Sequence, residues 1–431
     1  MTLKTPALLS LALSMAAALA ATSAHAASVL IENATLHTVS GGSYAGSLLI
    51  TDGKIADLKP TAQASSIAVP ADASRVDAGG AQLYPGLISA NSLIGLTEIE
   101  AIRASNDFAE TGDVNANARA QIAVNADSEQ IPVTRNGGVL TVHVVPANPN
   151  GLIVGRSAVI ALEGWNWEDM TLKADAGLHI VWPATLLPPW LPPAMRADAE
   201  RTALQRVETL KQSFEEARRY AQAVKAEPAT APDLRLAALI PVVEGRERAH
   251  VHAEDYASIR AAIDFFREQQ LKFTLIGGQD AWRLAADLKA DDVQLILSTP
   301  HNLPLRRHEG YDVVYRNAAR LHEAGLKFAI AGEGSAFGAS LEKNLGYVAG
   351  AAVGYGLPAE VALRSITLTP AELLGVGERL GSLEVGKDAT VFLASGSPLE
   401  ITSTVQRIWI RGKEVPVESR HTRFRDRYDA R

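Results

Sequence analysis

Two histidines and a glutamate occupy positions from which they could bind a metal ion. His252 lies in the apolar run RAHVHA, His301 follows the run DVQLILS, and Glu333 follows the run LKFAIAG. If these runs are parallel strands of one barrel, their carboxyl ends open on the same face and bring the three side chains together. Two histidines with one carboxylate form a known type of mononuclear metal site. The pattern therefore predicts a site for one divalent ion.

Each of these residues also has an ordinary structural interpretation. His252 can line a barrel without binding anything, His301 can be an exposed loop residue, and Glu333 sits in the glycine-rich stretch AGEGSAFG, which is typical of a surface loop. For His143 and His250, which lie inside strand-like runs, a hydrogen-bonded structural histidine is the favoured interpretation.

Two adjacent arginines, Arg306 and Arg307, lie in the stretch PLRRHEGYD close to the predicted metal residues. A guanidinium binds a carboxylate through two parallel hydrogen bonds, so the pair is a candidate clamp for a substrate carboxylate. The alternative is a solvated surface pair.

Short apolar runs at both ends of the chain predict strands. The runs SVLIENATLHTV and GSLLITDGKIADL lie near the start, and DATVFLASG and VQRIWIRGKEV lie near the end. Asp52-Gly53 and Gly412 are typical hairpin turns. Because isolated hairpins cannot bury a face alone, we expect the two ends to form one composite β-sandwich from residues 27–82 and 378–431.

Between these ends, seven apolar runs alternate with helical stretches and predict an α/β fold. A TIM-like (β/α)₈ barrel over residues 83–377 fits this alternation and the chain length of 431 residues. The eighth strand is not assigned. The proline-rich stretch Pro183–Pro193 predicts a surface loop, and a long polar helix is expected from about Ala194 to Ala226. The seven runs are LYPGLIS, GVLTVHVV, LHIVW, RAHVHA, LKFTLIGG, DVQLILS and LKFAIAG.

The first 26 residues are typical of a signal peptide. An apolar run from Ala7 to Ala21 precedes the small-x-small pattern Ala24-His25-Ala26. The run is too short to span a membrane, so we expect an exported, periplasmic protein without membrane insertion after cleavage. The chain contains no cysteine, which excludes disulfides and thiolate ligands, and its net charge of −7 argues against a nucleic-acid partner.

Several segments resemble the amidohydrolase superfamily, and in particular its exported imidazolonepropionase-like members. The stretches LITDGKIADL, GGAQLYPGLISANS and GLPAEVALRSITLTPAELLGV are similar to that family, as is the closing stretch RLGSLEVGKDATVFL. The resemblance implies a (β/α)₈ barrel with a composite β-sandwich. It also implies hydrolysis of carbon–nitrogen bonds with one or two divalent metals.

The same resemblance implies that most of the usual metal ligands are missing. The family has Asp-x-His-x-His on the first barrel strand, where this chain has Ser89, Asn91 and Leu93. His252 falls at a family ligand position, and Gly277 replaces a histidine. Glu333 falls at or beside the family's aspartate, so the resemblance implies that Glu333 is both a metal ligand and the catalytic carboxylate. Asn91 is then a candidate to orient water or substrate. Such losses should abolish a dinuclear site, leaving one divalent metal, with zinc preferred, or none.

Two functions remain in competition. One is a hydrolase that cleaves a carbon–nitrogen bond in a small molecule or small peptide. The other is a non-catalytic periplasmic protein that binds such a ligand, or that pairs with an intact homologous amidohydrolase. A homo-oligomer is compatible with either function.

Overall fold

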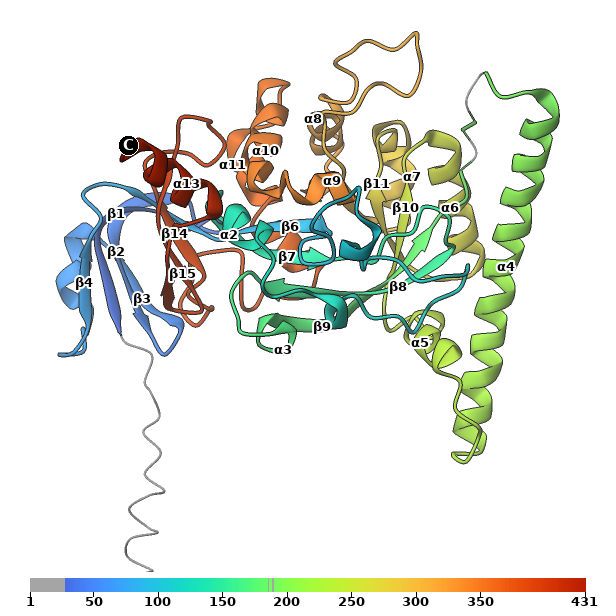
Figure 1. Ribbon diagram of the computed structural model, residues 1–431, viewed down its shortest axis with the longest axis horizontal. Helices are drawn as coiled ribbons and strands as arrows, with labels where there is room; N and C mark the ends of the chain where they lie inside the picture. Colours follow the sequence, from blue (N-terminus) through green and yellow to red (C-terminus); the bar gives the residue numbers. More distant parts are fainter. Residues whose placement is uncertain (1–27, 185, 188–189) are drawn as a thin grey trace, which may run out of the picture.

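The computed structural model describes residues 28–184, 186–187 and 190–431, so the expected signal peptide lies outside the described residues. Two eight-stranded sheets organise this part of the chain, one at an end of the molecule and one at its centre (Figure 1). No helix among the described residues has both the length and the apolar character needed to cross a membrane.

The first sheet joins the two ends of the chain, as predicted. Its strand order is β16-β15-β14-β5-β1-β2-β3, with β4 paired to β1. The N-terminal and C-terminal parts meet where β5 pairs with β14 in antiparallel register. The strands are β1 (Val29–His37), β2 (Ser43–Thr51), β3 (Lys54–Pro60), β4 (Ser74–Asp77), β5 (Gln82–Pro85), β14 (Val391–Ala394), β15 (Val405–Ile410) and β16 (Lys413–Val415).

Both predicted hairpin turns are present, and they lie against each other. Asp52 and Gly53 have φ of 52° and 78°, and Arg411 and Gly412 have φ of 49° and 77°. Positive φ at both central residues is the type I′ geometry that matches the twist of paired strands. A Cβ on Gly412 would lie 2.6 Å from the Cα of Gly53, so glycine allows the two turns to touch.

The second sheet is the nearly closed barrel, and its strands follow one another in chain order. The first of the seven predicted runs passes from β5 into β6, and the other six overlap β7 and β9 to β13, although LHIVW covers only the end of β9. The eighth strand is β8, which is antiparallel to both of its neighbours. The strands are β6 (Leu87–Ser92), β7 (Val139–Val144), β8 (Ile153–Ala161), β9 (Thr171–Val181), β10 (Ala249–Ala253), β11 (Phe273–Gly277), β12 (Gln294–Leu297) and β13 (Phe328–Ile330).

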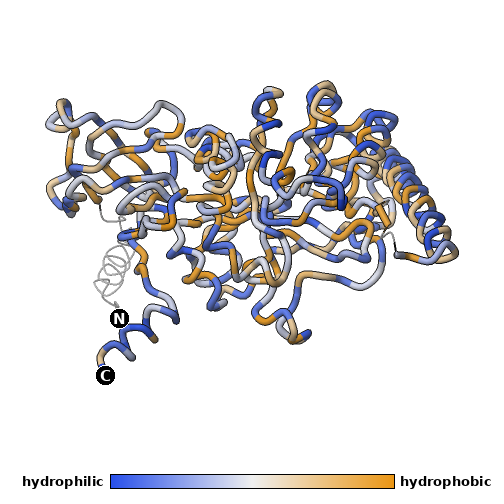
Figure 2. Tube along the Cα trace, turned by 90° about the horizontal axis from the view of Figure 1, so that it is seen from above, coloured by the Kyte–Doolittle hydropathy of each residue, from blue (hydrophilic) through white to orange (hydrophobic). Residues whose placement is uncertain are grey.

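Helices cover the outside of the barrel, and the longest of them is α4 (Pro193–Ala226), close to its predicted bounds. Its buried residues Leu210, Phe214, Ala217 and Ala221 recur every three or four positions and form one apolar stripe. Figure 2 shows hydrophilic residues along most of the rest of this helix. The other helices are α2 (Gln130–Arg135), α3 (Trp167–Met170), α5 (Leu234–Val243), α6 (Tyr256–Glu268), α7 (Ala285–Ala290), α8 (Asn317–Glu323), α9 (Ala336–Ala339), α10 (Leu345–Gly354), α11 (Ala359–Ser365), α12 (Leu368–Leu373) and α13 (Arg420–Asp429).

Helix α10 packs closely, at two of its glycines, against a loop of the composite sheet. A Cβ at Gly346 would overlap the carbonyl oxygen of Pro398, and one at Gly350 would overlap that of Leu399. Both carbonyls belong to the loop that follows β14. Because backbone cannot retreat as a flexible side chain can, these positions require glycine.

Gly346→Ala is therefore expected to destabilise the protein by about 2 kcal/mol. Gly354→Ala is the matched control, since the residue is on the same helix, two turns further on, and an added Cβ would meet nothing within 4 Å. Urea unfolding followed by circular dichroism measures both variants. Equal midpoints for the two variants would contradict the tight approach of α10 to this loop.

Candidate functional site

Four histidines from three strands meet inside the barrel. They are His143 on β7, His179 on β9, and His250 and His252 on β10. Residues two apart on a strand point to the same side, so both β10 histidines face the lumen. The ring centroids of His179 and His250 are 4.8 Å apart, and those of His143 and His250 are 5.3 Å apart. We call these four residues the lumen histidines.

Hydrogen bonds orient the rings of His143 and His179, whereas one ring nitrogen of His179 and one of His250 have no partner among the described residues. Nδ1 of His143 lies 2.8 Å from the carbonyl oxygen of Ala90, and its Nε2 lies 2.7 Å from Oγ of Ser157. Nδ1 of His179 lies 2.9 Å from Nε2 of His252. Among the described residues, Nε2 of His179 and Nδ1 of His250 are buried without a hydrogen-bond partner.

Burial keeps these imidazoles neutral. It lowers the pKa of His143 and of His252 to about 4, and it lowers the pKa of His179 and of His250 well below the usual value. A neutral imidazole carries a free lone pair, which is the form that binds a metal ion. One nitrogen from each of His143, His179 and His250 lies within 4.8 Å of the other two. This donor set fits a divalent transition metal.

A glutamate that the sequence interpretation missed stands at the mouth of the barrel. Glu254 directly follows β10, and its Oε2 accepts hydrogen bonds from the backbone N–H of Gln279 at 3.0 Å and from Oγ of Ser298 at 3.5 Å. A Cβ at Gly277 would lie 2.6 Å from Oε1 of Glu254. The carboxylate therefore fills the space where the family resemblance implies a histidine. Three successive strand ends, of β10, β11 and β12, meet around it.

The Glu254 side chain is exposed, although protein groups surround its carboxylate closely. Desolvation by these surroundings raises the pKa of its carboxyl group to about 7, although the hydrogen bond from Gln279 acts in the opposite direction. Carboxyl groups perturbed in this way are common at catalytic sites. The sequence signal for this residue was its place immediately after a strand, at the face where barrel enzymes carry their active sites.

A second carboxyl group lies buried behind the mouth. Glu342 begins the 3₁₀ helix Glu342–Asn344 and is 2% exposed. Burial raises its pKa to about 7, while the nearby hydroxyls of Ser89 and Ser92 lower it and the charge of Glu333 raises it. Neither carboxylate oxygen makes a hydrogen bond of normal geometry within the part of the chain that the structure describes.

The structure does not gather the predicted metal residues into one set. His301 is exposed, with its Nδ1 3.2 Å from Oγ1 of Thr299, and Glu333 is exposed and accepts a hydrogen bond from Oγ of Ser335 at 3.2 Å. Within the described ranges, the one group of three or more His, Cys, Asp or Glu side chains spaced for a metal is that of His143, His179 and His250. The set of His252, His301 and Glu333 stays a prediction.

At the end of the first barrel strand, Asn91 and Leu93 are buried and packed against other residues. Leu93 is 1% exposed and belongs to the hydrophobic core. Asn91 is buried, and its amide lies so close to Gly334 that a Cβ there would overlap it. Leu93 does not fit the paired metals that the family resemblance implies, because an aliphatic side chain cannot bind an ion. The predicted role of Asn91 in orienting water or substrate stays a prediction.

The two arginines predicted to clamp a substrate have different surroundings. Arg306 forms ion pairs with Asp280 at 2.7 Å and with Glu309 at 2.9 Å. Its guanidinium is thus held by carboxylates of the protein itself, whereas Arg307 is exposed. Substrate binding by this pair stays a prediction.

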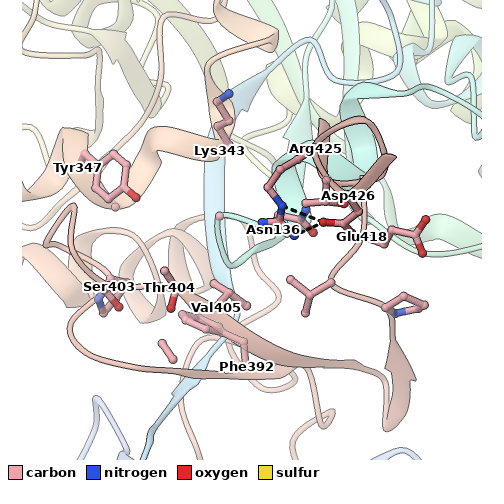
Figure 3. Close-up of a pocket in the computed structure, with 17 residues that line it drawn as sticks. Asn136, Lys343, Tyr347, Phe392, Ser403, Thr404, Val405, Glu418, Arg425 and Asp426 are labelled. Carbon is pink, nitrogen blue, oxygen red and sulfur yellow. Dashed lines mark hydrogen bonds and ion pairs between the residues drawn. The ribbon is translucent and has the colours of Figure 1, made fainter. Parts of the chain in front are cut away.

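The largest cavity among those described lies away from the lumen histidines, between α13, the composite sheet and the start of α10. It has a volume of about 620 Å³, and its lining includes Lys343, Tyr347 and Thr404 (Figure 3). Arg425 and Asp426, which also line it, form an ion pair at 2.6 Å. No residue of the barrel mouth lines this cavity, so we place the candidate site at the strand ends on their chemistry, not on cavity size.

The barrel, the composite sheet and polar groups at the strand ends are together typical of barrel hydrolases. A family model described as "Amidohydrolase family" matches residues 189–415. The chain belongs to the amidohydrolase family.

Two curated relatives match parts of the chain. It is 22% identical over 409 residues to the amidohydrolase tasK of Hapsidospora irregularis, covering 86% of this chain and 40% of that protein. It is 35% identical over 127 residues to the imidazolonepropionase of Syntrophobacter fumaroxidans, covering 26% of this chain and 30% of the relative. The chain therefore spans less than half the length of either relative.

Solved structures share the fold. An amidohydrolase from Thermotoga maritima MSB8 has a TM-score of 0.78 and 24% identity, with 90% of this chain and 99% of that chain covered. Molinate hydrolase has a TM-score of 0.53 and 16% identity, with 91% and 95% covered. At these identities the likeness shows the architecture alone.

Proposed function

We propose that this chain hydrolyses a carbon–nitrogen bond of a small molecule or small peptide at the mouth of its barrel. The observation that carries the proposal is the accessible carboxyl group of Glu254 where the ends of β10, β11 and β12 meet, two residues after His252. Membership of the amidohydrolase family supports the reaction type.

In this proposal Glu254 moves the proton during hydrolysis. Its carboxylate accepts a proton from water as the oxygen attacks the carbonyl carbon, and then returns a proton to the nitrogen as the carbon–nitrogen bond breaks. The backbone N–H of Gln279 and the hydroxyl of Ser298 hold the carboxylate in place. The products are a carboxylic acid and an amine.

The family also implies a divalent metal, with zinc preferred. When bound, such an ion lowers the pKa of its water from 15.7 to about 7 and so supplies hydroxide at neutral pH. The neutral lumen histidines provide donors of the right type, whereas Leu93 and Gly277 provide none. The other possible holders are the predicted residues His252, His301 and Glu333.

The test is turnover by the purified full chain. A panel of N-acyl amino acids, dipeptides and cyclic amides is incubated with the protein, with and without added Zn²⁺, and the released amine is measured. Release from at least one substrate class is expected. If no class releases amine above the rate without protein, the proposal fails.

A second candidate function is favoured by the filled ligand positions. Leu93 and the carboxylate of Glu254 occupy places where the family resemblance implies histidines, which suits a non-catalytic protein that binds a ligand or pairs with an intact amidohydrolase. Calorimetric titration with the same panel would then show binding without release of amine. Co-purification of an intact homologue would support the pairing form.

Export to the periplasm is part of the same proposal. It is supported by the apolar run Ala7–Ala21 and the pattern Ala24-His25-Ala26, both outside the described residues. Self-association of the chain is a further part of this proposal.

A further inference from the structure

Three of the lumen histidines lie deeper in the barrel than the metal position implied by family resemblance. His250 precedes His252 by two residues on β10, and two residues of a strand span about 6.6 Å. His179 is directly opposite His250 in the pairing of β9 with β10. These residues are therefore below the mouth, on the amino-terminal side of the position at which the resemblance places a ligand.

We propose that His143, His179 and His250 bind one divalent transition-metal ion within the barrel, with the Ala90 carbonyl and His252 holding two of the rings in orientation. The proposal goes beyond hydrolysis, because the binding of the ion is measured without any substrate. It also relocates the metal from the predicted set of His252, His301 and Glu333.

The hydrogen bonds of His143 place the lone pair of its ring on Nε2. The carbonyl of Ala90 can only accept, so Nδ1 carries the proton and Nε2 has the lone pair. In the described contacts that lone pair accepts from the hydroxyl of Ser157, which also lies 3.2 Å from the carbonyl oxygen of Gly177. The hydroxyl can turn to that carbonyl when an ion takes its place. A ring N–H held by a backbone carbonyl is the usual outer arrangement of a metal-bound histidine.

The pair of His179 and His252 leads to the same conclusion. If Nδ1 of His179 donates to Nε2 of His252, then Nε2 of His179 has a lone pair facing the other two rings. The reverse tautomer would leave Nε2–H of His179 buried with nothing to accept it within the described residues. Buried polar atoms without a partner are unfavourable. A metal ion satisfies this nitrogen and the unpartnered Nδ1 of His250 together.

Gly177 on β9 leaves room inside the barrel for the ring of His250. A Cβ at Gly177 would lie 2.7 Å from Nε2 of His250 and 2.8 Å from two of its carbon atoms. Only glycine at this position of β9 leaves room for the imidazole. His143 and His179 are fully buried and His250 is 4% exposed, so the rings have little freedom to turn away.

The donor set indicates which ions to expect. Three imidazoles and no carboxylate suit Zn²⁺, Co²⁺, Ni²⁺ or Cu²⁺, and they exclude Mg²⁺ and Ca²⁺, which prefer oxygen. The cationic side chains nearby are Lys173 and Arg156. The first donates to the carbonyl oxygen of Leu374, and the second is paired with Asp175 and Glu247. Nitrogens around tetrahedral zinc are about 3.3 Å apart. The donor nitrogens of the three histidines lie within 4.8 Å of one another, so they must move closer together when the ion binds.

The experiment uses the full chain, stripped with a chelator and titrated with Zn²⁺ and with Co²⁺. Elemental analysis counts the ions, the visible spectrum of bound Co²⁺ reports nitrogen ligation, and thermal unfolding reports stabilisation. One equivalent is expected for the unaltered chain. His179→Gln and His250→Gln should each weaken binding by on the order of 100-fold or more, because ligands are lost.

Matched controls separate this site from the predicted set at the mouth. His301→Gln and Glu333→Gln should bind the ion as the unaltered chain does. The proposal is overturned if the unaltered chain binds no ion, if binding survives loss of His179 and of His250, or if either control variant loses it. Circular dichroism checks the folding of each variant.

X-ray absorption of the zinc-loaded unaltered chain keeps the proposal testable even if the variants fold poorly. A shell with three imidazoles is expected, and a shell dominated by carboxylate oxygen overturns the assignment. A chain that binds the ion but releases no amine from the substrate panel would refute the proposed hydrolysis and leave the metal site standing.

Discussion

Glu254→Gln is expected to reduce kcat/KM for carbon–nitrogen hydrolysis at least about 100-fold, the usual scale for losing a proton-transfer group. The amide has nearly the same shape as the carboxyl group but cannot accept a proton from water. Since Glu254 is accessible and its Oε2 only accepts hydrogen bonds, at 3.0 Å and 3.5 Å, the substitution should leave the fold intact. The measurement is amine release with the best substrate of the panel, at saturating and at low concentration.

Glu360→Gln is the control for this variant. Glu360 is exposed on α11, on the outside of the barrel, so its substitution should leave turnover unchanged. If Glu254→Gln retains full activity while Glu333→Gln loses it, the proton-transfer role belongs to Glu333, as the family resemblance implies. The inactive variant also reveals any contaminating hydrolase, because a contaminant would remain active in both preparations.

The elements that could be predicted are those whose residue pattern agrees with their surroundings. The hairpin turns at Asp52-Gly53 and Gly412 need positive φ, and the strands of the barrel are continuous apolar runs because both faces are buried. Strand β8 was missed because Arg156 and Ser157 interrupt its apolar run. Arg156 is 6% exposed only because Asp175 and Glu247 pair with it, and these partners are distant in sequence.

The site was predicted less well, because its chemistry depends on register between strands. His250 and His252 are two residues apart, which was a signal that both face the same side. The structural interpretation of His143 and His250 assumed hydrogen-bond partners, which the sequence alone does not reveal. In the structure His143 has two partners, whereas Nδ1 of His250 has none among the described residues. His179 was not considered, since nothing in LHIVW reveals that β9 lies beside β10.

Two glycines at the strand ends lie close to polar side chains of the chain itself. Gly277 leaves a space that the carboxylate of Glu254 fills, and Gly334 leaves a space that the amide of Asn91 approaches. Polar groups of the chain itself thus occupy the positions where the family resemblance implies metal chemistry. The proposed metal site rests separately on the unpartnered nitrogens of His179 and His250, deeper in the lumen.

Glu342→Gln is expected to change how stability depends on pH. The folded-state pKa of Glu342 is about 7, above its usual value of 4.5, because burial opposes ionisation and the charge of Glu333 adds to the effect. The folded chain therefore holds this proton more tightly than the unfolded chain. The stability contributed by the neutral group is complete below pH 4.5 and is lost as the pH rises through 7.

A glutamine stays neutral at every pH, so this loss is absent from the variant. Relative to the unaltered chain, Glu342→Gln should therefore gain about 3 kcal/mol of unfolding free energy between pH 4.5 and pH 8. Urea unfolding at both pH values measures the gain, and the difference between them removes any constant effect of packing the amide beside Ser89 and Ser92. Glu360→Gln, at an exposed position on α11, is the control variant in the same measurement. A Glu342→Gln curve parallel to that of the unaltered chain would mean that the carboxylate ionises freely and that water reaches the space behind the barrel mouth.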